Sequence, residues 1–237
     1  MATAKAPISA KDATLLPELE FVEVYDEPLH PTVFVNDYVR VLKVNCPRNQ
    51  DTMFHRHSQD SFFLFFKTTR IRNEVVGKEP FEVELETGKF YWGDHLANPI
   101  IHKICVGERE LDCMDVEFKA DRPKPASCSP TLPNTSKRNL CFENHVMRAY
   151  RVHLAPGQAI DSVLATAEMI EGGNGAAERF AYLAVAMKSA KLSRGEVKAG
   201  DNWWCGGGSG DVSGGIDCAA WSNLGEEEAE VMILQPK

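Results

Sequence analysis

The sequence predicts an all-β protein made of two similar halves, and two observations lead to this prediction. Short apolar segments rich in β-branched and aromatic residues alternate with polar ones, as strands and their connections do. Residues 34–44 share Phe, Asn, Arg and Val with residues 142–152 at a shift of 108, and the Gly-x4-Gly-Asp pattern at 88–94 returns at 195–201, shifted by 107. Matched landmarks in the same order predict a duplicated β-domain.

Length and charge limit the classes of partner. With 237 residues, of which 43% are hydrophobic, the chain is long enough for two domains with packed cores. A net charge of −8 argues against nucleic acid or an anionic membrane as the main partner. No apolar run approaches the roughly 18 residues that a membrane helix needs. We therefore expect a small-molecule substrate or ligand, and exposed strand edges would also allow a homodimer.

The N-terminus and the cysteines predict a cytoplasmic location. The first residues lack the apolar stretch of a secretory signal, and the first arginine is Arg40, which gives little support to organelle import without excluding it. The seven cysteines form no close pair at metal-binding spacing and are odd in number. Free thiols in a reducing compartment fit this pattern best.

The first half contains a series of predicted strands. Residues 1–20 are expected to form a tail, and 21–119 the first domain, with a turn at 47–50. Residues 34–44 are expected to form one long strand, and the strict alternation at 81–86 predicts a strand with one wet face. The predicted strands cover 21–25, 34–44, 54–57, 62–72, 81–86, 100–106 and 113–118.

The second half follows a change in composition. Residues 120–139 are rich in proline and polar residues and predict a linker, after which 140–237 form the second domain. Residues 182–187 suit a buried strand or a helix, and the repeat favours the strand. The glycine-rich residues 206–210 are not framed like a phosphate loop and are expected to be a mobile connection.

Three histidines are candidate metal ligands. His55 and His57 stand at i and i+2, so on a strand their side chains share one face with Cα atoms about 6.6 Å apart. Two imidazoles this close can bind one ion together. His102 is the third candidate, and it follows the turn-like Gly93-Asp94.

The His55-x-His57 pair, followed by Gly88, Gly93-Asp94, Pro99 and His102, resembles the two motifs of the cupin superfamily. The resemblance implies tandem double-stranded β-helix barrels, related to jelly rolls, and hence a bicupin. It also implies that the first barrel holds a metal through His55, His57 and His102.

The sequence departs from the cupin pattern in its carboxylate. The motif glutamate falls on Ser61 or Phe62, which leaves a site of three histidines similar to that of the thiol dioxygenases, a cupin group that holds Fe(II). The expected cofactor is one divalent ion, with Fe(II) favoured and Mn, Ni or Zn as alternatives. Asp60 should face away from the histidines and is a poor candidate ligand, whereas Gln59 shares their face and is a minor candidate for orienting a substrate.

The second copy lacks the metal-binding residues. The repeat aligns Val163 and Ala165 with the histidine pair, and Ser209 with His102. The sequence therefore predicts that the second domain holds no metal. Among the other histidines, His95 is expected to lie in a loop, and His30, His145 and His153 to have ordinary roles.

Three functions fit this pattern. The favoured one is a mononuclear non-haem metal enzyme with dioxygenase-like chemistry on a small molecule. A metal-dependent lyase or isomerase is the first alternative. The second is a cupin without catalysis that binds, senses or stores a ligand, because loss of the motif glutamate is what a retired active site would show.

Overall fold

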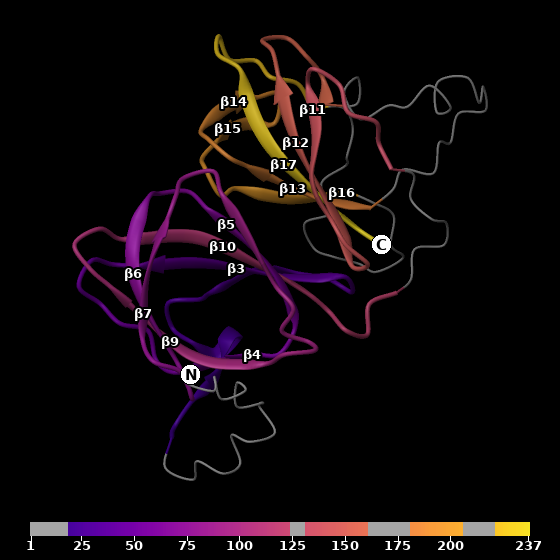
Figure 1. Cartoon of the computed structure of the whole chain (residues 1–237). Coiled ribbons are helices and arrows are strands. Elements are labelled where there is room, and N and C mark those ends of the chain that lie inside the picture. The colour runs from indigo at the N-terminus through magenta and orange to yellow at the C-terminus, as the bar shows by residue number, and fades with distance from the viewer. Residues whose placement is uncertain (1–18, 124–130, 161–180, 206–220) are drawn as a thin grey trace, which may run out of the picture. The chain divides into compact units, whose positions relative to one another are not determined.

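The structure of the chain is a computed structural model that describes residues 19–123, 131–160, 181–205 and 221–237 (Figure 1). It divides into two compact units, Met1–Pro123 and Lys124–Lys237. The boundary between them lies inside the predicted linker. The elements described are β-strands and one 3-10 turn, η2 (Val24–Asp26). Within these ranges no helix has the length and apolar character needed to cross a membrane.

The first unit contains two five-stranded sheets. The first sheet has, in spatial order, β1 (Val22–Glu23), β4 (His55–His57), β9 (Ile100–Val106), β6 (Thr69–Val75) and β7 (Phe81–Leu85). The second sheet has β2 (Thr32–Val35), β3 (Val39–Cys46), β10 (Leu111–Phe118), β5 (Asp60–Phe65) and β8 (Phe90–Gly93). Their hydrogen-bond ladders do not join, so the predicted barrel is open and the unit is a two-layer sandwich.

An apolar cluster fills one part of this sandwich. It combines side chains of both sheets, among them Val44 and Phe65 from the second and Ile71 and Ile104 from the first. Burial of such side chains from water provides most of the stabilisation of a small domain. The apolar cluster therefore holds the two sheets face to face.

The second unit repeats the second sheet of the first. Its strands are β11 (Arg138–Glu143), β12 (Met147–Leu154), β17 (Ala229–Pro236), β13 (Tyr182–Ala186) and β16 (Asn202–Cys205), in that spatial order. This matches the order β2-β3-β10-β5-β8 strand for strand. The strand preferred at 182–187 is confirmed as β13. A two-stranded sheet of β14 (Ala190–Leu192) and β15 (Gly195–Val197) completes the described part.

The long strands predicted at 34–44 and 142–152 are both hairpins, which corrects the prediction. Asn36 Oδ1 accepts hydrogen bonds from the N–H groups two and three residues ahead, both at 2.9 Å. Asn144 Oδ1 does the same at 2.8 and 2.9 Å. An asparagine side chain that bonds its own backbone in this way forms a turn. Each asparagine thus interrupts a pattern that is apolar and β-rich on both sides.

The second landmark of the repeat also needs correction. The N–H of Gly88 donates to the carbonyl of Phe65 at 2.8 Å, and the N–H of Gly200 donates to the carbonyl of Ala186 at 2.8 Å. Both glycines have positive φ, 77° and 86°. The structural counterpart of Gly88 is therefore Gly200, not Gly195. The shift is 112 instead of 107 because the connections between strands differ in length in the two units.

The counterparts of the histidines in the second unit are only partly described. Val163, Ala165 and Ser209 lie outside the described residues. In the second unit the N–H of Ile160 donates to the backbone carbonyl of Trp221 at 2.9 Å. In the first unit the N–H of Thr52 donates to the backbone carbonyl of Ile104, also at 2.9 Å. Trp221 thus takes the place of Ile104 at a shift of 117.

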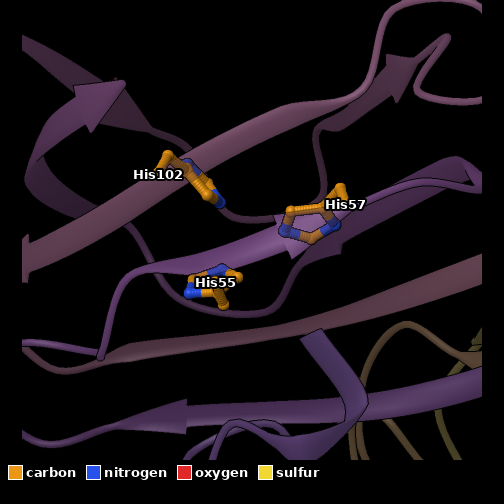
Figure 2. A group of neighbouring side chains, drawn as sticks. All are labelled: His55, His57 and His102. Atoms are coloured by element: carbon orange, nitrogen blue, oxygen red, sulfur yellow. The ribbon is translucent and has the colours of Figure 1, made fainter. Parts of the chain in front are cut away.

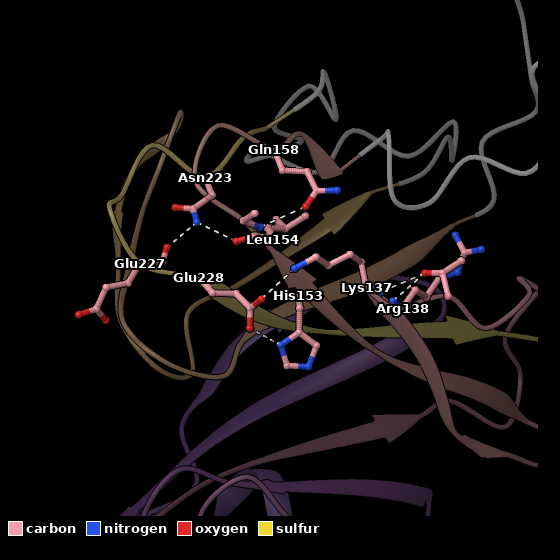
Figure 3. Close-up of polar contacts among 10 residues, drawn as sticks. Lys137, Arg138, His153, Leu154, Gln158, Asn223, Glu227 and Glu228 are labelled. Carbon is pink, nitrogen blue, oxygen red and sulfur yellow. Dashed lines mark hydrogen bonds and ion pairs between the residues drawn. The ribbon is translucent and has the colours of Figure 1, made fainter.

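A buried asparagine ties the entry of β17 to the end of β12 (Figure 3). Asn223 is fully buried, and its Nδ2 donates to the carbonyls of Leu154 and Glu227 at 2.8 and 2.7 Å. Beside it, Glu228 contacts the Nζ of Lys137 at 3.1 Å and the Nδ1 of His153 at 2.9 Å. This end of the second unit is held by polar contacts, and His153 takes part in them.

Candidate metal centre

The two histidines of β4 point into the sandwich, as predicted. His55 and His57 are 0% and 1% exposed. Arg56 between them faces outward, where its guanidinium pairs with the carboxylate of Glu23. Period-two alternation on the strand therefore sends both imidazoles to the inner face.

The neighbouring strand brings the third histidine beside them (Figure 2). His102 on β9 is the direct antiparallel partner of His55. The ring centroid of His102 lies 4.5 Å from that of His55 and 5.0 Å from that of His57. One ligand atom from each of the three residues can be chosen so that all lie within 4.8 Å of one another. The three predicted residues are thus gathered at one point.

The hydrogen bonds of the rings leave nitrogen lone pairs free at this point. The Nδ1 of His55 bonds the carbonyl of Met53 at 2.9 Å, and the Nδ1 of His102 bonds Oδ1 of Asn73 at 3.0 Å. A ring nitrogen that donates to such an acceptor fixes the tautomer and leaves Nε2 with its lone pair. In the described part of the chain, His55 Nε2, His102 Nε2 and His57 Nδ1 are buried without a hydrogen-bond partner.

Buried polar atoms without partners are rare, and a metal ion is one group that satisfies them. Three buried imidazoles that can each direct a ring nitrogen to within 4.8 Å of the others have the donor chemistry of a transition-metal or zinc site. The residues present therefore fit a metal ion, on the evidence of their own unsatisfied atoms.

The imidazoles are neutral at physiological pH. Burial, assisted by the charge of His30, lowers the pKa of His55 to about 4. Burial and the neighbouring imidazoles hold the pKa values of His57 and His102 well below the ordinary value. Because metal binding requires the unprotonated imidazole, no proton competes with the cation near pH 7.

Two further histidines, neither of them predicted to lie at the site, join the cluster. The ring of His30 lies 4.6 Å from that of His55, and the ring of His95 lies 5.2 Å from that of His57. Both residues are buried. His95 lies in a loop, as predicted. The prediction of an ordinary role for His30, and that of a loop histidine for His95, did not include these contacts because neither residue belongs to a recognisable spacing pattern.

His30 and His55 are connected through a buried glutamate. Glu27 Oε2 contacts the Nδ1 of His30 at 2.5 Å, and its Oε1 accepts from the N–H of Met53 at 3.2 Å. Met53 in turn accepts from His55 through its carbonyl. Burial opposes ionisation of Glu27, but the hydrogen bonds from His30 and the backbone lower its pKa. Glu27 thus positions both imidazoles from outside the triad.

Gln59 and Asp60, the residues weighed beside the histidine pair, have other partners. Asp60 Oδ1 accepts from the N–H of Leu96 at 3.1 Å and so fixes the loop that carries His95. Gln59 Oε1 accepts from the N–H of Ala120 at 2.8 Å. The structure gives both side chains a part in holding loops in place.

A carboxylate from the opposite sheet faces the histidines. Asp115 on β10 is 0% exposed, and its Oδ2 lies 3.4 Å from the Nδ1 of His57. Burial raises its pKa to about 6, against the opposing effect of charges on His30 and His95. Asp115 belongs to no motif or spacing pattern in the sequence and was not predicted as a site residue. The signal available was an acidic residue inside a segment whose neighbours are apolar.

Similar folds are found among solved structures, at low sequence identity. Bacterial pirin YhhW from Escherichia coli, solved in complex with nickel(II), has a TM-score of 0.52 and 14% identity over 87% of this chain and 89% of its own. The Cupin 2 conserved barrel domain protein from Leptotrichia buccalis has a TM-score of 0.50 and 8% identity over 87% of each chain.

A third similar structure is salicylate 1,2-dioxygenase from Pseudoaminobacter salicylatoxidans, solved as adducts with gentisate. Its TM-score is 0.50 at 11% identity, over 95% of this chain and 77% of its own. No family model matches the chain, and neither does any curated protein. At these identities the likeness concerns the fold.

Proposed function

Because the chain has the cupin fold, we propose that it is a bicupin that binds one divalent metal ion in its first domain, through His55, His57 and His102. Two observations carry the proposal: the three histidines each offer a ligand nitrogen within 4.8 Å of the others, and each has a buried nitrogen without a hydrogen-bond partner among the described residues. The second domain, 140–237, is a degenerate copy without a cupin metal site.

Fe(II) is the favoured ion. A site of three imidazoles with no sulfur ligand suits iron, nickel, zinc and manganese better than calcium or magnesium. The bacterial pirin of similar fold was solved in complex with nickel(II), so a transition metal is compatible with this fold in that protein. We therefore propose Fe(II), with Mn, Ni or Zn as alternatives.

We further propose dioxygenase-like chemistry on a small molecule. When bound, a metal held by three protein ligands supplies open coordination positions and Lewis acidity. The protein orients two of the three imidazoles, His55 through Met53 and His102 through Asn73, and it limits water by apolar walls. Phe63 contributes one wall, with its ring 5.7 Å from that of His57.

A lyase or isomerase is the second candidate, and one observation favours it. The Nδ1 of His95 is buried without a partner in the described part of the chain, next to the ring of His57. A group in this position can hold or move a proton of a bound substrate. A cytoplasmic location and a homodimer stay predictions, the second testable by light scattering.

Elemental analysis of the purified protein tests the proposal. We expect about one equivalent of a divalent metal in the wild type and less than about a tenth of that in His57→Ala, because two histidines alone bind weakly. The control is His145→Ala, since His145 is exposed and far along the chain from the triad. Equal metal in wild type and His57→Ala would contradict the metal site.

The identity of the metal separates the functions. A stoichiometric redox metal in protein produced without added metal supports the oxidative enzyme. Zinc, or no metal, supports the binding, sensing or storage alternative.

A further inference from the structure

Asp115 is a buried carboxylate whose environment has no explanation in the protein alone. It is fully buried. Its only polar support in the described part of the chain is weak: Ser61 is close enough to lower its pKa, but neither carboxylate oxygen has a hydrogen bond of ordinary geometry. An isolated ionised carboxylate inside a protein is costly unless it is paired with a cation. The described residues provide Asp115 with no lysine or arginine partner, and its one ion-pair contact is the Nδ1 of His57 at 3.4 Å.

A divalent ion bound by the three histidines and the buried carboxylate of Asp115 would compensate each other's charge. Three neutral imidazoles that bind a divalent ion leave two positive charges uncompensated in a buried site. The unpartnered nitrogen of His57 is the atom next to Asp115. We propose that Asp115 is the counter-charge of the metal site and takes the place of the glutamate that the histidine motif lacks. This inference rests on the proposed metal site.

In this conformation Asp115 influences the metal site through its charge and is not a fourth ligand of the metal. Its oxygens are not among the ligand atoms that all lie within 4.8 Å of one another. A carboxylate next to a ligand raises metal affinity by its charge and by hydrogen bonds to the ligand or to a metal-bound water. Asp115 is therefore a positioning residue for the metal.

The second unit provides an internal comparison. Asp115 pairs with Leu42 of β3 and Phe63 of β5, and the corresponding position of β17, Ile233, pairs with Tyr150 of β12 and Ala184 of β13. Ile233 is fully buried in the apolar core. The same sheet position thus accepts an apolar side chain, so the fold does not require an acid there.

The two units differ both at the predicted position of the histidine pair and at the position of the acid. The first unit has both His55 and Asp115. In the second, Ile233 stands in place of the acid, and the sequence repeat predicts that Val163 corresponds to His55. This is the pattern expected if the carboxylate of Asp115 compensates the charge of a bound metal ion.

The test compares Asp115→Asn with a matched aspartate variant, Asp60→Asn, in the full-length protein. Asp60 is also buried in the first unit, but it bonds the N–H of Leu96. The probe is Zn²⁺, whose dissociation constant is measured by competition with a chromophoric chelator, and thermal unfolding is measured on the metal-free proteins. We expect Zn²⁺ to bind about 10- to 100-fold more weakly to Asp115→Asn, and within a few-fold of wild type to Asp60→Asn.

The stability of the metal-free protein separates this role from a structural one. Removing an unpaired buried charge should leave the melting temperature of metal-free Asp115→Asn unchanged or higher. Affinity equal to wild type, or a melting temperature that falls together with affinity, overturns the inference and leaves the histidine site standing. A wild-type protein that binds no Zn²⁺ overturns the inference and the proposed function together.

Discussion

At the scale of single residues, the site depends on imidazoles that stay neutral. His55 is fully buried among other imidazoles, and its outer nitrogen is committed to the carbonyl of Met53. Protonation would bury a charge, which is why the pKa falls to about 4. The same burial that keeps His55 ready for a cation therefore makes the metal-free protein sensitive to acid.

A pH series on the metal-free protein tests this sensitivity. Unfolded His55 takes up its proton near pH 6.5, and the folded form resists until about pH 4. Between these values the unfolded state binds more protons, so stability falls as pH falls. From pH 7.5 to pH 5, His55→Gln should lose about 2 kcal/mol less of its free energy of unfolding than wild type.

Urea unfolding at each pH gives the measurement, and His145→Gln is the control. Asp115 contributes the opposite trend, since its pKa is raised and its cost appears as pH rises, but it does so in both proteins. Parallel pH profiles of wild type and His55→Gln would contradict the lowered pKa of His55.

At the scale of elements, the connection between β8 and β9 places a fourth imidazole next to the triad. Gly93 ends β8, and a Cβ atom there would lie 2.2 Å from Nε2 of His95. Only a glycine lets the imidazole pack this closely over the strand. Asp60 holds the following N–H of Leu96. The position of His95 is therefore built into the loop.

Gly93→Ala should displace His95 and lower the free energy of unfolding by about 1–3 kcal/mol, because the added methyl group overpacks a buried contact. Gly107→Ala is the matched control, since the nearest atom to its Cβ would be a carbonyl oxygen at 3.9 Å. Urea unfolding measures both variants. Metal content should stay at one equivalent, because His95 is outside the triad. Equal free energies of unfolding for the two variants would show that the loop accommodates the added methyl group without loss of stability, which would contradict this prediction.

At the scale of the whole molecule, the two units share the strand order of one five-stranded sheet but differ in the side chains that they bury. The first unit collects buried polar residues between its sheets, whereas the core of the second is apolar, with the side chains of Trp203 and Trp221 in T-shaped contact at 4.9 Å. A ligand that binds the first unit should therefore stabilise that unit and leave the other unchanged.

Hydrogen exchange with and without Zn²⁺ measures this. At a concentration of about 100 times the dissociation constant, amides of β4 and β9 should gain about 2.7 kcal/mol of protection. Those of β12 and β17 should gain none. The His57→Ala protein, with Zn²⁺ added, is the control and should show no gain in either unit. An equal gain in both units of the wild type would mean that they open together or that the second binds the ion.

The sequence by itself determined the strands and the three histidines of the candidate site. Alternation at 55–57 and 100–106 predicts strands and the faces of their side chains because the period of a strand is a local property of the chain. The cupin motifs added His102, and the repeat at a shift of 108 predicted that Asn36 and Asn144 stand at equivalent places. Both are properties that can be counted along the chain.

The tertiary structure decided everything that depends on distant segments meeting. Asp115 reaches the triad from strand β10, and His30 and His95 reach it from two different connections. No spacing in the sequence encodes their approach. The matching of Gly88 with Gly200 depends on which strands pair, because loop lengths change the count between them. The two hairpins depend on how one asparagine side chain bonds the backbone. Burial then gives these groups their shifted pKa values, since desolvation exists only once the chain has folded.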